Sequence, residues 1–94
     1  MESLTDRIDT INRLVNEGTI NEALEAARTL VRDNPGSAEA WFTLGKILWK
    51  LGRRAEATSA YRTAADIDPA GPAAIALAHA QDIADYFNPD LFNP

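Results

Sequence analysis

Apolar residues recur every three or four positions along most of the chain, which is the period of an amphipathic α-helix. The clearest example is the stretch after Ser37, a good N-cap residue, where the apolar face is formed by Trp41, Leu44, Leu48 and Leu51. The pattern predicts five helices, with ends placed to within about two residues. They span 4–17, 20–33, 38–51, 54–67 and 72–87.

Glycines mark where these predicted helices end and where they pack. Gly18 and Gly52 follow the first and third helices, and we expect both to adopt a positive φ. Gly45 lies on an apolar helix face, so we expect the backbone of the next helix to approach it closely. Trp41 and Tyr61 should fill the space beside this contact.

Capping residues support the helix starts. Ser3 and Asp6 resemble a capping box, in which the two residues bond each other's backbone N–H groups. Thr19 and Glu22 have the same spacing directly after Gly18, so they are predicted to form a second one.

The chain repeats itself with a period of 34 residues, and eight identical residues relate its first third to its centre. The pairs are Leu14 with Leu48, Gly18 with Gly52, Glu22 with Glu56, Ala23 with Ala57, Ala26 with Ala60, Arg28 with Arg62, Thr29 with Thr63 and Pro35 with Pro69. A fixed period of this length is the signature of a helical repeat protein.

The central unit resembles a tetratricopeptide repeat (TPR) in its residues Trp41, Leu44, Gly45, Leu48, Gly52, Ala57, Tyr61, Ala64 and Pro69. The resemblance implies an all-α fold, a right-handed α-solenoid of two TPR helix hairpins plus a C-terminal closing helix and a short aromatic tail. Residues 1–94 would form a single TPR-like domain. Its parts would be a first unit (3–35), a second unit (36–69), the closing helix (70–87) and the tail (88–94).

Composition is consistent with one small helical domain. The 94 residues are 46% hydrophobic, and 17 of them are alanine, so the core depends on close helix approach more than on bulk. No apolar run is long enough to span a membrane. The N-terminus, MESLTDRIDT, carries acids where a signal peptide carries basic residues. We therefore expect a soluble, cytoplasmic protein.

Charge is segregated along the chain. The net charge is −5, yet residues 40–62 carry a basic band of Lys46, Lys50, Arg53, Arg54 and Arg62 against the single acid Glu56. The acidic total argues against nucleic-acid binding. The basic band favours an acidic partner, or an acidic part of the same chain.

Catalytic chemistry has little support in the sequence. There is one histidine, no cysteine and no glycine-rich phosphate loop. His79, Asp82 and Asp85 recur at a spacing of three, but one imidazole with two carboxylates is a poor ligand set for a transition metal. We predict a non-enzymatic protein with no cofactor, in which these residues form a polar stripe.

The resemblance implies a protein-interaction module, or adaptor, that binds a partner peptide or helix in a concave groove lined by the first helix of each unit. The groove-facing residues would be Ile8, Asn12, Val15, Asn16, Phe42, Lys46, Trp49, Lys50, Ala76, Ala80 and Ile83. The stripe on helix 38–51 joins two aromatic rings to two lysines, which suits an apolar anchor beside an acidic group. The alternative is that Phe42 and Trp49 only pack between helices.

One TPR sub-type binds a terminal carboxylate with lysines, an arginine and asparagines. Asn12 matches one of its positions, but the others hold Ile8, Thr43, Ala73 and Leu77, which supply no charge. We therefore reject this carboxylate clamp. A different arrangement that uses Lys46 and Lys50 stays open.

The closing helix suggests an alternative function, a self-assembling subunit that homodimerises through this helix and the tail. Residues 72–84 are apolar on almost every side, which is typical of a helix buried on more than one side. Its outward residues are expected to be Ala74, Leu77, Ala78 and Ala84, and the second interface would comprise Leu77, Tyr86, Phe87, Leu91 and Phe92. We expect an ordered tail that folds onto the body, within one chain or across a dimer, rather than a frayed end.

Overall fold

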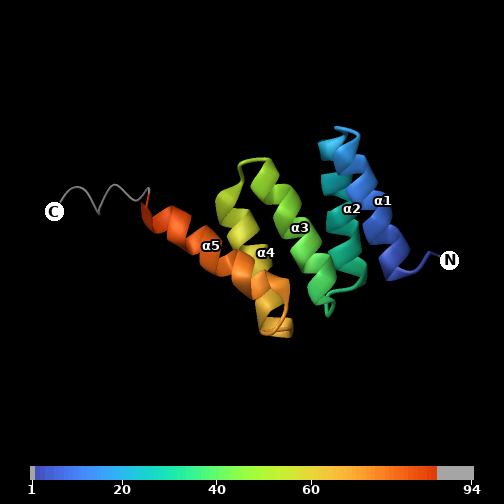
Figure 1. Cartoon of the computed structure of the whole chain (residues 1–94). Coiled ribbons are helices and arrows are strands. Elements are labelled where there is room, and N and C mark those ends of the chain that lie inside the picture. Colours follow the sequence, from blue (N-terminus) through green and yellow to red (C-terminus); the bar gives the residue numbers. More distant parts are fainter. Residues whose placement is uncertain (1, 87–94) are drawn as a thin grey trace.

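Five helices follow one another along the chain in the computed structural model, which describes the backbone of residues 2–86 and the side chains of residues 2–80. Within these bounds there is no β-strand. The helices are α1 (Leu4–Asn16), α2 (Ile20–Asp33), α3 (Ala38–Lys50), α4 (Arg54–Ile67) and α5 (Pro72–Tyr86) (Figure 1). Every predicted helix is confirmed, and each predicted end lies within one residue of the observed one.

The helices pack in chain order as two hairpins and a final helix. α1 packs against α2 and α3 against α4, while α5 packs mainly against α4 (Figure 1). α2 also contacts α3, and α3 touches both α1 and α5. This confirms the all-α arrangement of hairpins, while the right-handed sense of the solenoid and the division into units stay predictions.

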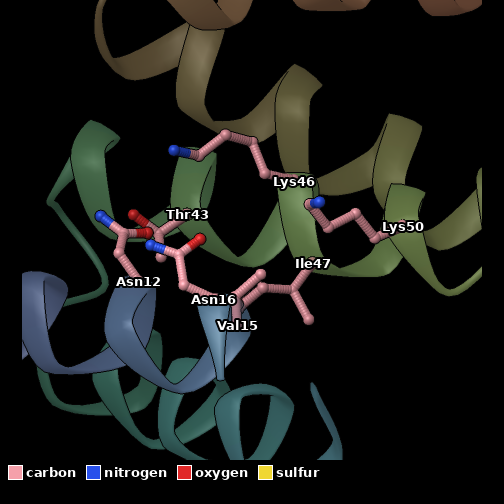
Figure 2. Close-up of a pocket in the computed structure, with 7 residues that line it drawn as sticks. All are labelled: Asn12, Val15, Asn16, Thr43, Lys46, Ile47 and Lys50. Atoms are coloured by element: carbon pink, nitrogen blue, oxygen red, sulfur yellow. The ribbon is translucent and has the colours of Figure 1, made fainter. Parts of the chain in front are cut away.

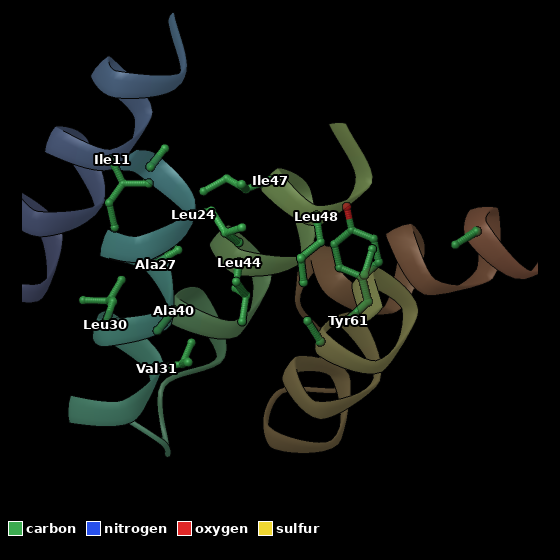
Figure 3. Packing of buried hydrophobic residues seen from close by; sticks show 14 residues of the cluster. Ile11, Leu24, Ala27, Leu30, Val31, Ala40, Leu44, Ile47, Leu48 and Tyr61 are labelled. Carbon is green, nitrogen blue, oxygen red and sulfur yellow. The ribbon is translucent and has the colours of Figure 1, made fainter. Parts of the chain in front are cut away.

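The core forms where the two hairpins meet. Figure 3 shows Leu24 and Ala27 of α2 facing the α3 side chains Ala40 and Leu44. Five alanines have no exposed surface at all: Ala23, Ala27, Ala40, Ala57 and Ala64. Methyl side chains at these positions allow the helices to lie close together, as the alanine content predicted.

Both glycine turns have the same hydrogen-bonded geometry. Gly18 and Gly52 have φ values of +84° and +78°, which confirms the predicted positive φ. At each turn the glycine N–H donates to the second-last carbonyl of the helix, and the next N–H donates to the carbonyl before it. This Schellman motif satisfies backbone groups that the helix end would otherwise leave unpaired.

Gly45 does provide close packing, but its contact is a side chain and not the backbone that we predicted. The aromatic ring of Tyr61, on α4, occupies the space where a side chain on Gly45 would lie. Tyr61 is 5% exposed, as predicted for a core residue, whereas Trp41 is only half-buried. The indole N–H of Trp41 donates to the Pro35 carbonyl oxygen at 2.9 Å, which holds this ring at the edge of the core.

Two of the three predicted caps are confirmed. Ser3 and Asp6 form the capping box of α1, and the Ser37 hydroxyl accepts from the Ala40 N–H at 3.2 Å. The Thr19–Glu22 box is wrong. Thr19 has a ψ of 60° instead of an extended conformation, and its hydroxyl donates to the Leu14 carbonyl at 2.8 Å. The turn at Gly18 therefore holds Thr19 in a backbone conformation in which its side chain does not cap α2.

In residues 72–80, the part of α5 whose side chains the structure describes, the helix is buried on one side, which corrects the expectation of burial on several sides. Ala73 and Ala80 are buried against the preceding hairpin, and Leu77 packs partly against the core instead of facing outward. The exposed large residue is Ile75, at 75% exposure, which the sequence argument did not single out. Within residues 2–86 no helix follows α5 to cover that side.

Candidate functional site

A cavity of about 260 Å³ lies between α1 and α3, and we call it the polar cavity. Its lining residues are Asn12, Val15, Asn16, Thr43, Lys46, Ile47 and Lys50 (Figure 2). Four of them were predicted as groove residues with functional polar groups. The structure thus brings Asn12, Asn16, Lys46 and Lys50 together around one hollow.

Helical periodicity places these four side chains. Asn12 and Asn16 are four residues apart on α1, and Lys46 and Lys50 are four apart on α3, so each pair shares one helix face. Figure 2 shows both amides directed toward α3 and both lysine chains running along α3 toward its Thr43 end. The apolar lining comes from Val15 and Ile47.

The cavity offers hydrogen-bond donors to a ligand. An ammonium group carries three N–H donors and a primary amide two, while the amide oxygen can also accept. Among the described side chains, neither Lys46 nor Lys50 has a carboxylate oxygen within 4.0 Å. Positive charge and amide N–H groups around a partly apolar hollow suit a carboxylate on a larger ligand.

Thr43 contributes differently. Its hydroxyl donates to the Glu39 carbonyl at 2.8 Å, so its proton is used inside α3. The hydroxyl oxygen can still accept a hydrogen bond.

Phe42 packs between helices, as expected under the alternative in which this ring has no role in partner binding. Its ring centroid is 5.8 Å from that of Tyr61, and the Lys46 ammonium lies 5.0 Å above the Phe42 ring. Phe42 also lines a small hollow of about 50 Å³ between α3, α4 and the start of α5. A contact between Phe42 and a partner stays a prediction.

A second hollow, the aromatic cavity, lies between α3, α4 and α5. Its volume is about 200 Å³, and it is lined by Trp49, Tyr61, Ala76, His79 and Ala80. The guanidinium carbon of Arg54 lies 5.1 Å from the Trp49 ring centroid, within cation–π range. Burial removes water from the Tyr61 hydroxyl and raises the pKa of this phenol above its usual value of 10.0.

Of the remaining predicted groove residues, some line the aromatic cavity and others are in neither of these two cavities or lie outside the described side chains. Ile8 is half-buried and packs against the core, outside the polar cavity. Trp49 and Ala80 line the aromatic cavity. The side chain of Ile83 lies outside the described residues.

The predicted second interface falls mostly beyond the described part of the chain. Phe87, Leu91 and Phe92 lie outside it, as does the side chain of Tyr86. Leu77, its one described residue, packs partly against the core. The ordered tail and the homodimer therefore stay predictions.

Sequence reasoning missed the parts of the cavities that depend on tertiary packing. It did not assign Ile47, Arg54 or His79 to a site. A usable signal existed for Arg54: it follows Trp49 by five residues across the Gly52 turn, and such a turn returns the chain beside the last turn of α3.

None of the helices within residues 2–86 has the length and apolar character needed to cross a membrane. Among the described side chains, no three His, Asp or Glu residues gather closely enough to hold a metal ion. His79 is exposed, and the side chains of Asp82 and Asp85 lie outside this part of the chain.

Comparison with known proteins gives consistent matches. A family model described as "Tetratricopeptide repeat" matches residues 8–72. The solution NMR structure of a Bacteroides fragilis protein superposes with a TM-score of 0.79 and 34% sequence identity, covering 94% of this chain and 90% of that one.

Two curated proteins match a shorter segment. They are the cytochrome c-type biogenesis proteins CcmH of Escherichia coli (strain K12) and of Shigella flexneri, each 38% identical over 55 residues. This segment is 58% of the chain, and it spans only 16% of the length of either relative.

Proposed function

The chain belongs to the tetratricopeptide repeat family, and from this premise we propose that it is a non-enzymatic interaction module that binds a segment of a partner protein on the face formed by α1 and α3. TPR units generally mediate protein–protein interaction, because stacked repeats present an extended binding surface. The proposal concerns which surface of this chain is used and what chemistry the partner brings to it.

The observation that carries the proposal is the polar cavity. Side chains from two repeat units, Asn12 and Asn16 on α1 with Lys46 and Lys50 on α3, converge on one hollow. Surface lysines usually extend singly into solvent, whereas these two share a hollow with two amides and an apolar lining. Such a site can orient a bound carboxylate through several hydrogen bonds at once.

An acidic partner segment fits this surface best. The protein has a net charge of −5, and residues 40–62 are the part of the chain in which basic side chains outnumber acidic ones. Complementary charge speeds encounter with an acidic segment and discourages basic ones. Binding should therefore weaken as salt is added.

The likeness to the CcmH proteins supports a shared interaction unit and no more specific role. The matched segment is 16% of each of those proteins, so a part in cytochrome c-type biogenesis is not carried over to this chain. The polar cavity is a better guide to the partner because its residues belong to this chain.

A charge-reversal experiment tests the proposal. The immobilised wild-type chain captures proteins from a cell lysate, and the same capture is run with a Lys46→Glu/Lys50→Glu variant. The matched control is Arg32→Glu/Arg62→Glu, which makes the same charge change at exposed positions on α2 and α4. Circular dichroism checks that all three chains are folded.

We expect that some proteins are captured by both the wild type and the control but are not captured by the Lys46→Glu/Lys50→Glu variant. Because both variants carry the same net charge, this result assigns binding to the α1–α3 face. Equal capture by the Lys46→Glu/Lys50→Glu variant and the wild type would overturn the proposal.

A further inference from the structure

The polar cavity and the aromatic cavity lie on the two sides of α3. The polar cavity lies between α1 and α3, and the aromatic cavity is lined from α3, α4 and α5. Figure 1 shows α3 between α1 and α5. Lys46 and Lys50 line the first, and Trp49 lines the second. A segment that lies across α3 can therefore reach both.

The aromatic cavity exists because two positions of α5 carry only methyl groups. In the 34-residue register, Ala76 corresponds to Phe42 and Ala80 to Lys46, so α3 has large side chains where α5 has small ones. Ala80 and Tyr61, at 3% and 5% exposure, form the buried part of the lining. The chain has thus left a space in its second and third units that a side chain from elsewhere can fill.

The size and surface of this space specify what can fill it. An apolar cavity of about 150 Å³ is enough to hold a benzene molecule, so a volume of about 200 Å³ admits one aromatic or branched aliphatic side chain. The Trp49 and Tyr61 rings and the two alanine methyl groups offer contact to apolar atoms. Most of this lining is apolar, with the Tyr61 hydroxyl and the exposed His79 imidazole as its polar groups, so the space favours an apolar side chain over a charged one.

The rim adds a charge preference. Arg54 stacks on Trp49, with its guanidinium carbon 5.1 Å from the centre of the Trp49 ring. A basic side chain entering here would meet like charge, while an acidic residue in the same segment would be attracted.

We propose that the aromatic cavity is a second subsite for the same partner segment, which carries one bulky apolar side chain in addition to its carboxylate. This inference rests on the proposed function. The two cavities flank one helix, and packed helices lie roughly 8–10 Å apart. An extended chain advances about 3.3 Å per residue, so the carboxylate and the apolar residue should stand about three positions apart.

Selection from a displayed library of random short peptides tests the inference with the intact chain as bait. Enriched peptides should contain Asp or Glu about three positions from Phe, Leu, Ile or Trp. Enrichment of acidic peptides with no preference for an apolar residue would overturn the second subsite and leave the proposed function standing. Enrichment without acidic residues, or no enrichment, would contradict both.

A cavity-filling variant then tests whether the apolar side chain of the peptide binds in the aromatic cavity. Ala76→Phe restores the residue that stands at the equivalent position of α3, and Ala78→Phe is the control, at an exposed position of the same helix. Fluorescence polarisation measures the affinity of the selected peptide. Ala76→Phe should lower this affinity about tenfold or more, which is the equivalent of losing one buried apolar side chain. Ala78→Phe should bind like the wild type.

The same peptide with its apolar residue replaced by alanine should bind the wild type and the Ala76→Phe variant equally. If Ala76→Phe weakens both peptides alike, the variant acts through a general disturbance and the assignment fails. Full-strength binding of the original peptide by a folded Ala76→Phe variant would likewise overturn it.

Discussion

Gly45 and Tyr61 fit against each other so closely that the glycine cannot carry a side chain without movement of the ring. A Cβ atom built on Gly45 would lie 2.6 Å from both Cδ1 and Cε1 of Tyr61, well inside contact distance. The ring is buried between α3 and α4, and it also forms a wall of the aromatic cavity. One glycine therefore determines both how the second hairpin packs and where the proposed apolar subsite lies.

Gly45→Ala should lower the free energy of unfolding by about 1–3 kcal/mol, the usual effect of forcing extra atoms into a packed core. Chemical denaturation measures it. Gly36→Ala is the matched control, since a Cβ at Gly36 meets no atom within 4 Å and its φ is not positive. The ring contact would be refuted by equal denaturation midpoints for the two variants.

Gly52 is needed for its backbone conformation and not for close packing. A Cβ there would meet no atom within 4 Å, but the φ of +78° disfavours residues that carry a side chain. Gly52→Ala should destabilise by about 1–2 kcal/mol, and the β-branched Gly52→Val by more. Thermal melting compares them, and equal shifts would argue against the left-handed conformation.

Tyr61 should make the fold sensitive to alkaline pH. Its pKa is raised above 10.0 by burial, so above pH 10 the unfolded chain loses the phenol proton before the folded chain does. The folded state then binds more protons, and the free energy of unfolding falls as pH rises further.

The measurement is urea denaturation at pH values below and above 10, with Tyr61→Phe as the comparison. Phenylalanine keeps the ring and removes the titrating group, so the variant should lose less stability than the wild type over this interval. The same loss in both proteins would show that other groups cause it.

Much of the fold could be predicted from sequence because helix period and glycine position are local signals. The 34-residue repeat located the hairpins, and the positive φ at Gly18 and Gly52 followed from their places after apolar helices. The Thr19 cap failed because the turn at Gly18 holds Thr19 at a ψ of 60°, outside the extended conformation that a capping residue usually has. The spacing of Thr19 and Glu22 contains no information about that backbone angle.

The polar cavity could be predicted from the sequence because it depends on helical spacing and on the 34-residue repeat. The grouping of Asn12 and Asn16 with Lys46 and Lys50 followed from helical spacing and the resemblance. The aromatic cavity did not, because it depends on how α5 packs against the second hairpin. The sequence argument placed Leu77 on the outer side, whereas Ile75 is exposed there.

The central claim is that a partner segment binds on the α1–α3 face, and ¹H–¹⁵N NMR titration of the intact chain with a selected peptide tests it most directly. The account predicts that the largest shift changes occur at the amides of Asn12, Asn16, Lys46 and Lys50, including both asparagine side chains. Exposed positions on α2 and α4, such as Arg32 and Arg62, should change little. Largest changes on α2 and α4, or changes confined to α5, would contradict the account.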